Sequence, residues 1–169
     1  NPFTYISGSE ETLIGKDITA QPLPSGASSW ADITDDLDMS GSESFTLSAG
    51  EYSATSITIS DIAILTISGD VTLYVSGPTQ FSDWAQVRFE GEASLTLYAA
   101  GNVSFSDNSG TDYMVPSGEA ENFIIYGISG CDTITFSDFC DVSAGVYAPD
   151  ANITMHDFSY LKGSFVGET

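Results

Sequence analysis

Aspartate recurs along this chain at the end of a repeated four-residue phrase. The phrase reads TISD, QFSD, SFSD, TFSD and TMHD, and it ends at Asp61, Asp83, Asp107, Asp138 and Asp157. Carboxylates at a fixed spacing support two kinds of chemistry. A pair about 5–5.5 Å or 6.5–9.5 Å apart can cleave a glycosidic bond, and a denser row can hold cations. A third interpretation is structural, with each aspartate turning the chain at the corner of a repeat.

The charge balance argues against the catalytic interpretation. Asp and Glu number 24, against three basic residues, Lys16, Arg88 and Lys162, which gives a formal net charge of −21. Lyase chemistry on an anionic polysaccharide needs a basic group, and His156 is the only histidine. Nucleic-acid binding needs clustered Lys and Arg, and no apolar run approaches the roughly 20 residues of a membrane-spanning helix. We therefore expect no catalytic residues, no enzymatic activity, no nucleic-acid partner and no membrane insertion.

One acidic stretch outside the repeated phrase has the spacing of a calcium loop. DLDMSG, at 36–41, matches the opening of such a loop, with Asp36, Asp38 and Ser40 as oxygen ligands and Glu43 close by. The match is partial, because Leu47 occupies the position where a bidentate Glu is expected. The alternative is an aspartate-rich turn that caps its own backbone. Calcium is the one cofactor that the sequence suggests, and the stacked corner aspartates are a second candidate place for cations.

The residues around each aspartate indicate the elements that position it. Large apolar side chains stand two residues before it, at Ile59, Phe81, Phe105, Phe136 and Met155, while the residues three before it are polar. This alternation is typical of a half-buried strand. A second strand is expected to begin with the residue after the aspartate, so that Trp84 faces the core. A third strand lies in GDVTLYV (69–75) and EASLTLYAAG (92–101).

Stacking these repeats in register predicts a parallel β-solenoid, in which each coil buries its apolar residues only against its neighbours. We expect an all-β fold, a right-handed three-sided β-helix of about five coils that forms one structural domain. Residues 1–44 are expected to form an N-terminal cap or flanking strands, and residues 45–169 the solenoid. The Gly-, Ser- and acid-rich segment 108–121 is expected to be a loop inserted in the third coil, either functional or a tolerated surface loop.

Three phrases carry a resemblance to a known kind of domain. They are ILTISGDVTLYVSG (64–77), ASLTLYAAGNVSFSD (93–107) and AGVYAPDANITMHDFSYLKGSFVG (144–167). They resemble an uncharacterised bacterial β-solenoid domain of exported surface and pilus-associated proteins. The resemblance implies a solenoid fold and a cell-surface setting, with no enzymatic activity. This sequence departs from the family at the corners, which end in aspartate here and are more often Ser-Gly-Asn in the family.

Cysteine content and composition bear on the compartment. Cys131 and Cys140 are the only cysteines, and their spacing is not that of a redox or zinc motif. In an exported protein they would form a disulfide if they faced each other, and the sequence leaves this open. The acidic composition, with few basic residues, fits an extracellular or cell-surface location.

These observations favour a structural surface protein. Its open coil ends and the strand-like FTYISG at 3–8 suggest subunits that join head to tail into a homo-oligomer or filament by strand addition. The alternative is a calcium-stabilised adhesion or carbohydrate-binding module. It would contact surface glycans through the 108–121 loop and exposed aromatic residues such as Trp30 and Trp84, although the alternation places Trp84 in the core.

Overall fold

The structure is a computed structural model that describes residues 19, 21–33, 36–111 and 120–168. It confirms the predicted all-β class: one sheet of parallel strands winds into a β-solenoid of about six turns, one more than expected. The only helices in the described ranges are two short 3-10 turns, η1 (Ala27–Ser29) and η2 (Ala120–Asn122). Neither is long or apolar enough to cross a membrane.

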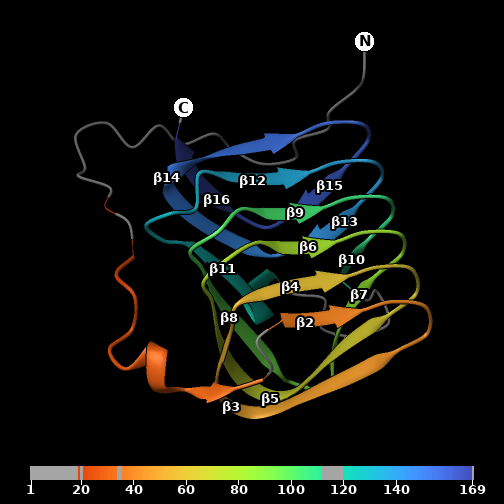
Figure 1. Ribbon diagram of the computed structural model, residues 1–169. Coiled ribbons are helices and arrows are strands. Elements are labelled where there is room, and N and C mark those ends of the chain that lie inside the picture. The colour runs from red at the N-terminus through yellow and green to blue at the C-terminus, as the bar shows by residue number, and fades with distance from the viewer. Residues whose placement is uncertain (1–18, 20, 34–35, 112–119, 169) are drawn as a thin grey trace.

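Strand pairing divides the solenoid into three faces, and Figure 1 shows the strands of one face stacked above one another. The first face contains β2 (Asp36–Met39), β4 (Ser56–Ile59), β6 (Thr79–Phe81), β9 (Val103–Phe105), β12 (Thr133–Phe136) and the end of β14 (Gly145–Met155). The second contains the starts of β3 (Ser44–Ala54) and β5 (Ile64–Val75), then β7 (Gln86–Phe89), β10 (Gly110–Thr111), β13 (Asp141–Ser143) and β15 (Tyr160–Lys162).

The third face closes the triangle. It contains β1 (Ala31–Asp32), the ends of β3 and β5, β8 (Ser94–Ala99), β11 (Phe123–Gly127), the start of β14 and β16 (Phe165–Glu168). β3 and β5 each run through two faces and bend between them. At this bend Gly69 has φ 97°, and a Cβ on it would approach Ala49 Cβ to 2.9 Å, so that both backbone and space favour glycine there.

Inward side chains of successive coils form columns because the strands pair in register. One column of the first face consists of Met39, Ile59, Phe81, Phe105, Phe136 and Met155. Phe81 stacks on Phe105 at 4.8 Å between ring centroids, and Phe105 stacks on Phe136 at 5.6 Å. These rings are almost completely buried, so the column forms the dry interior that the alternation predicted.

The described part of residues 1–44 contributes strands to the solenoid. β2 pairs with β4, and β1 pairs with β3. The preceding segment runs along the outside of the stack (Figure 1). At its start the carbonyl oxygen of Thr19 accepts a 2.9 Å hydrogen bond from Tyr147 Oη, on β14. The segment therefore joins the two ends of the solenoid.

Candidate functional site: the aspartate corner

All five repeated aspartates lie at the same corner, between the first and second faces. Each is the second residue of a β-turn that is closed by a backbone hydrogen bond, such as Ala85 N–H to Ser82 O at 3.0 Å. The five aspartates have φ between 51° and 58°, the left-handed region that Asp and Asn tolerate better than most residues. The backbone conformation thus explains why the phrase ends in aspartate.

The side chains of several corner aspartates bond to their own or neighbouring turns. Asp61 Oδ2 accepts the Gly41 N–H at 2.9 Å, and Asp83 Oδ2 accepts the Ser82 hydroxyl at 3.1 Å. Asp157 Oδ2 lies 2.6 Å from His156 Nδ1, and both side chains are more than half exposed. His156 therefore pairs with its own turn, at the position that serine occupies in the other four phrases.

The corner turns are of two kinds. At Asp61 only the second residue of the turn has positive φ, whereas from Asp83 onward the third residue also has positive φ. These patterns match type II′ and type I′ turns, which differ by a flip of the peptide between the second and third residues. The flip reverses the direction in which the N–H of the third turn residue donates its hydrogen bond. The Ile62 N–H donates back to Gly41 O, but the Trp84 N–H donates forward to Asp107 O.

The third residues of these turns form what we call the corner row: Ile62, Trp84, Asn108, Phe139 and Phe158. The expectation that Trp84 faces the core was wrong, because its side chain is 59% exposed. The third position of a β-turn points away from the core, and the inward register resumes one residue later, at Ala85 and its equivalents. Phe139 and Phe158 are equally exposed, and their rings stack at 5.3 Å.

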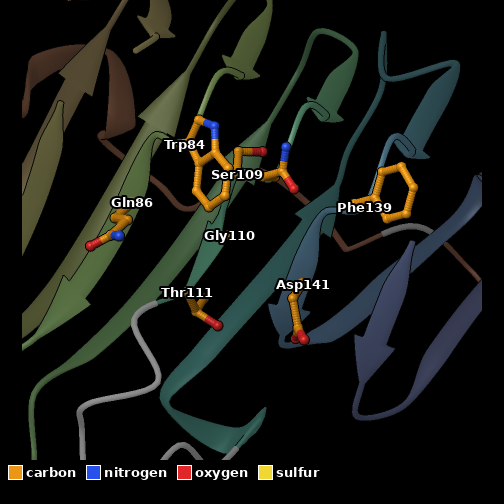
Figure 2. Close-up of a pocket in the computed structure, with 8 residues that line it drawn as sticks. Trp84, Gln86, Ser109, Gly110, Thr111, Phe139 and Asp141 are labelled. Carbon is orange, nitrogen blue, oxygen red and sulfur yellow. The ribbon is translucent and has the colours of Figure 1, made fainter. Parts of the chain in front are cut away.

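The corner row has a gap at Asn108, and a hollow of about 310 Å³ lies there. Trp84 and Phe139 stand on either side of it in Figure 2, with Ser109 and Gly110 between them. On the neighbouring strands Gln86, Gly110 and Asp141 share one register position. A Cβ on Gly110 would collide with the Asp141 carbonyl oxygen, so the backbones of β10 and β13 approach too closely there for any residue but glycine. The lining consists of Trp84, Gln86, Asn108, Ser109, Gly110, Thr111, Phe139 and Asp141.

Some polar groups of the hollow already form hydrogen bonds within the protein. Ser109 Oγ donates to Phe81 O at 3.0 Å and is buried. Thr111 Oγ1 accepts the Ser143 N–H at 3.0 Å, which leaves its hydroxyl proton able to donate. Among the described residues of the lining, Asp141 is the one that is acidic. The hollow therefore combines two exposed rings with amide, hydroxyl and carboxylate groups.

The calcium candidates lie at the N-terminal end of the solenoid, on β2 and in the turn that follows it. Asp36 and Asp38 occupy outward positions of β2, so these two residues lie on a strand. Asp36 Oδ1 accepts the Ser56 hydroxyl at 2.6 Å, and Glu43 Oε2 accepts the Ser40 N–H at 2.8 Å. Within the described ranges no three His, Cys, Asp or Glu side chains gather as a metal-binding group. Calcium binding stays a prediction from the sequence.

The two cysteines do not form the disulfide that the sequence left open, since both thiols are free and buried. They lie beyond opposite ends of the four residues of β12, which span about 13 Å when extended, whereas Cα atoms joined by a disulfide lie about 4.4–6.8 Å apart. Burial raises the pKa of Cys131 to about 11 and that of Cys140 to about 12. Both thiols are therefore protonated and unreactive at neutral pH.

Sequence reasoning missed most of this site. Of the expected 108–121 loop, residues 112–119 lie outside the described residues, while 108–111 form part of a corner and β10. Trp30 is half-buried near β1, away from the hollow. One feature of the sequence could have indicated the site. The residue directly after the aspartate is large and apolar in four of the five repeats, and Asn108 is the exception.

Comparison with known proteins identifies the chain by its sequence family. No curated protein and no solved structure matches it. The model of one family matches residues 8–169, which is most of the chain and includes the whole corner. The chain therefore belongs to the family described as Domain of unknown function (DUF7305).

Proposed function

We propose that this protein is a non-enzymatic structural component of a cell surface whose subunits join end to end by strand addition. The observation that carries the proposal is the difference between the two ends of the solenoid. Met39 and Met155 terminate the same inward column, yet Met39 is only 5% exposed, whereas Met155 is half-buried. The end formed by β14, β15 and β16 thus leaves part of its apolar interior accessible.

Other residues of that end behave in the same way. Ile153 on β14 and Leu161 on β15 are only partly buried, and Phe165 on β16 is 48% exposed. Within the described part of the chain, β15 and β16 each pair with a strand on one side only. An apolar surface beside unpaired strand edges is the kind of surface to which a further strand adds. We call this surface the acceptor end.

The corner hydrogen bonds give the acceptor end a polarity. From Trp84 onward each corner N–H donates to the next coil, as with Phe139 N–H to Asp157 O at 3.0 Å. Phe158 has the same left-handed conformation, with φ 61°. Its N–H therefore points toward the position of a further coil, where an added strand would supply the acceptor.

The donor in this proposal is the strand-like segment FTYISG, at 3–8, which lies outside the described residues. Thr19, the first described residue, is held at β14 by the hydrogen bond from Tyr147. Thr19 thus lies beside β14, one of the strands of the acceptor end. In the proposal, segment 3–8 adds as a strand to the acceptor end of a neighbour, which would link two copies.

Composition and resemblance support the cell-surface setting. A net charge of −21 keeps the chain soluble, and salt-rich surroundings screen the repulsion between subunits that would otherwise oppose their assembly. The sequence phrases resemble domains of exported and pilus-associated bacterial proteins. On the basis of these two features, the proposal includes an extracellular location and membership of a filament.

Light scattering across a concentration series tests the proposal. We expect the chain to form oligomers whose mass grows with concentration, and Phe165→Asp, which charges the acceptor end, to reduce that growth. Ile62→Asp is the matched control: it changes an apolar residue near the other end of the solenoid that is more exposed still, 61% against 48% for Phe165. Ile6→Pro should act like Phe165→Asp, because proline cannot donate to a strand pair. A strict monomer at high concentration would refute end-to-end assembly.

A further inference from the structure

The corner row contains aromatic residues where the backbone disfavours them. Trp84, Phe139 and Phe158 have φ of 71°, 63° and 61°, and bulky residues in this region are genuine outliers. A left-handed conformation costs about 1–2 kcal/mol for a residue with a Cβ. The rings are also 59–62% exposed, so burial returns little of that cost. Strained, exposed residues of this kind gather at functional sites.

The hollow at Asn108 is the place of one missing ring in this row. Phe139 and Phe158, one coil apart, stack at 5.3 Å, whereas Trp84 and Phe139 lie two coils apart, with Asn108 between them. A ligand that bears one ring can fill that place and contact both neighbours. Coils repeat at about 4.8 Å, which is more than the 3.5–4.0 Å of carbon–carbon contact. The spacing favours a puckered ring, which is thicker than a planar one.

The polar lining indicates what that ring must carry. Gln86, Asn108 and Thr111 offer amide and hydroxyl groups that both donate and accept hydrogen bonds. Asp141 adds a carboxylate that already takes part in another interaction of the fold. The corner carboxylates of the Asn108 turn and of the next one, Asp107 and Asp138, disfavour an anion. The volume of about 310 Å³ is at the small end of ligand pockets, which measure about 300–1,000 Å³.

From these observations we propose that the hollow between Trp84 and Phe139 binds one sugar ring of a neutral glycan. The apolar faces of the sugar contact the two rings, and its hydroxyl groups bond to Gln86, Asn108 and Thr111. A cationic group is the less suitable occupant, because the described lining contains one carboxylate against four neutral polar side chains. This binding is separate from end-to-end assembly, since the hollow is lined by residues on and before β7, β10 and β13 and not by β14, β15 or β16.

Isothermal titration with neutral oligosaccharides tests the proposal. The probes are the hexamers of cellulose, mannan, xylan and chitin, with oligogalacturonate as the anionic and tetramethylammonium as the cationic comparator. We expect at least one neutral probe to bind with a Kd below about 10 mM. Trp84→Ala and Phe139→Ala should each weaken that binding by about tenfold or more.

Two further variants separate the hollow from the rest of the row. Asn108→Phe should fill the hollow with a ring of the protein itself and abolish binding, while the melting temperature shows that the fold persists. Phe158→Ala, at the same turn position but one coil beyond the hollow, should leave Kd within about twofold. The proposal is overturned if no neutral probe binds, if only the cation binds, or if Asn108→Phe leaves the affinity unchanged.

Discussion

Two of the three middle coils set one aromatic ring inside the solenoid and another outside it, three residues apart. Inside, Phe81, Phe105 and Phe136 stack in a column and are at most 2% exposed. Outside, Trp84 and Phe139 stand in the corner row and are about 60% exposed. The two sets share the same repeat and nearly the same spacing, but they differ in backbone conformation and in contact with water.

The difference shows which rings stabilise the fold. An inner ring is removed from water and packs on rings above and below it, so that burial and stacking both favour the folded state. An outer ring gains little from burial and adopts a costly left-handed backbone. The inner column accounts for stability, and the corner row is better explained by binding.

The strongest test of this contrast is the removal of one ring from each set. Phe105→Ala should lower the free energy of unfolding by about 3–5 kcal/mol, because it leaves a cavity in the middle of the inner column. Phe158→Ala deletes the same side chain at an exposed position and should cost less than about 1 kcal/mol. Urea unfolding measures both values. Equal losses would contradict the division into two sets.

A second test uses pH, because Cys140 is on the inner side of the turn that carries Phe139. Burial raises the pKa of Cys140 to about 12 and that of Cys131 to about 11, from an ordinary 9.0. The unfolded chain therefore releases these protons first as pH rises. Stability should be fully present below about pH 9 and should fall toward pH 11, by roughly 1 kcal/mol or more per pH unit.

The control for this effect is the double variant Cys131→Ala, Cys140→Ala. Its stability should fall less steeply than that of the unchanged chain between pH 8 and pH 10, when both are measured by urea unfolding. Parallel pH profiles would show that the two thiols are not held in their neutral form by the fold.

A third test removes an unpaired hydroxyl group from the interior. Thr79 is fully buried on β6, between Ile57 and Val103 in the register, and its Oγ1 has no hydrogen-bond partner. An unsatisfied buried hydroxyl costs about 1–3 kcal/mol. Thr79→Val has nearly the same shape and should raise the free energy of unfolding by about 1 kcal/mol. Thr58→Val, on the outward side of β4, is the control and should change it by less than about 0.5 kcal/mol.

The smallest expected effect concerns the strain of the corner row. Phe139→Asn replaces a ring with the residue type that position 108 already has, and asparagine tolerates positive φ. Relief of strain should offset the lost stacking on Phe158, so that stability stays the same or rises by up to about 1 kcal/mol. Ile62→Asn should bring no such relief, because Ile62 is not among the residues with positive φ. A loss above 1 kcal/mol at Phe139 would mean that the outer ring also stabilises the fold.

Sequence reasoning was reliable where alternation governs the structure and failed where a turn interrupts it. The strands ending at Phe81, Phe105 and Phe136 were predictable because side chains alternate on a pleated strand. Trp84 was misplaced because the second strand was expected to begin directly after the aspartate, whereas Asp83 and Trp84 are the two central residues of the turn and the strand begins only at Gln86. The hollow was out of reach, because it depends on Gln86, Gly110 and Asp141 sharing one register position across three coils.

The reversal of the corner hydrogen bonds also bears on the order in which the chain folds. The Ile62 N–H bonds to an earlier residue, so the second corner is satisfied as soon as it lies on the first. Each later corner, from Trp84 onward, waits for an acceptor in chain that follows it. During synthesis, which proceeds from the N-terminus, the strands of the newest coil could bond to the preceding coil at once, but its corner N–H would stay unpaired until the next coil had formed.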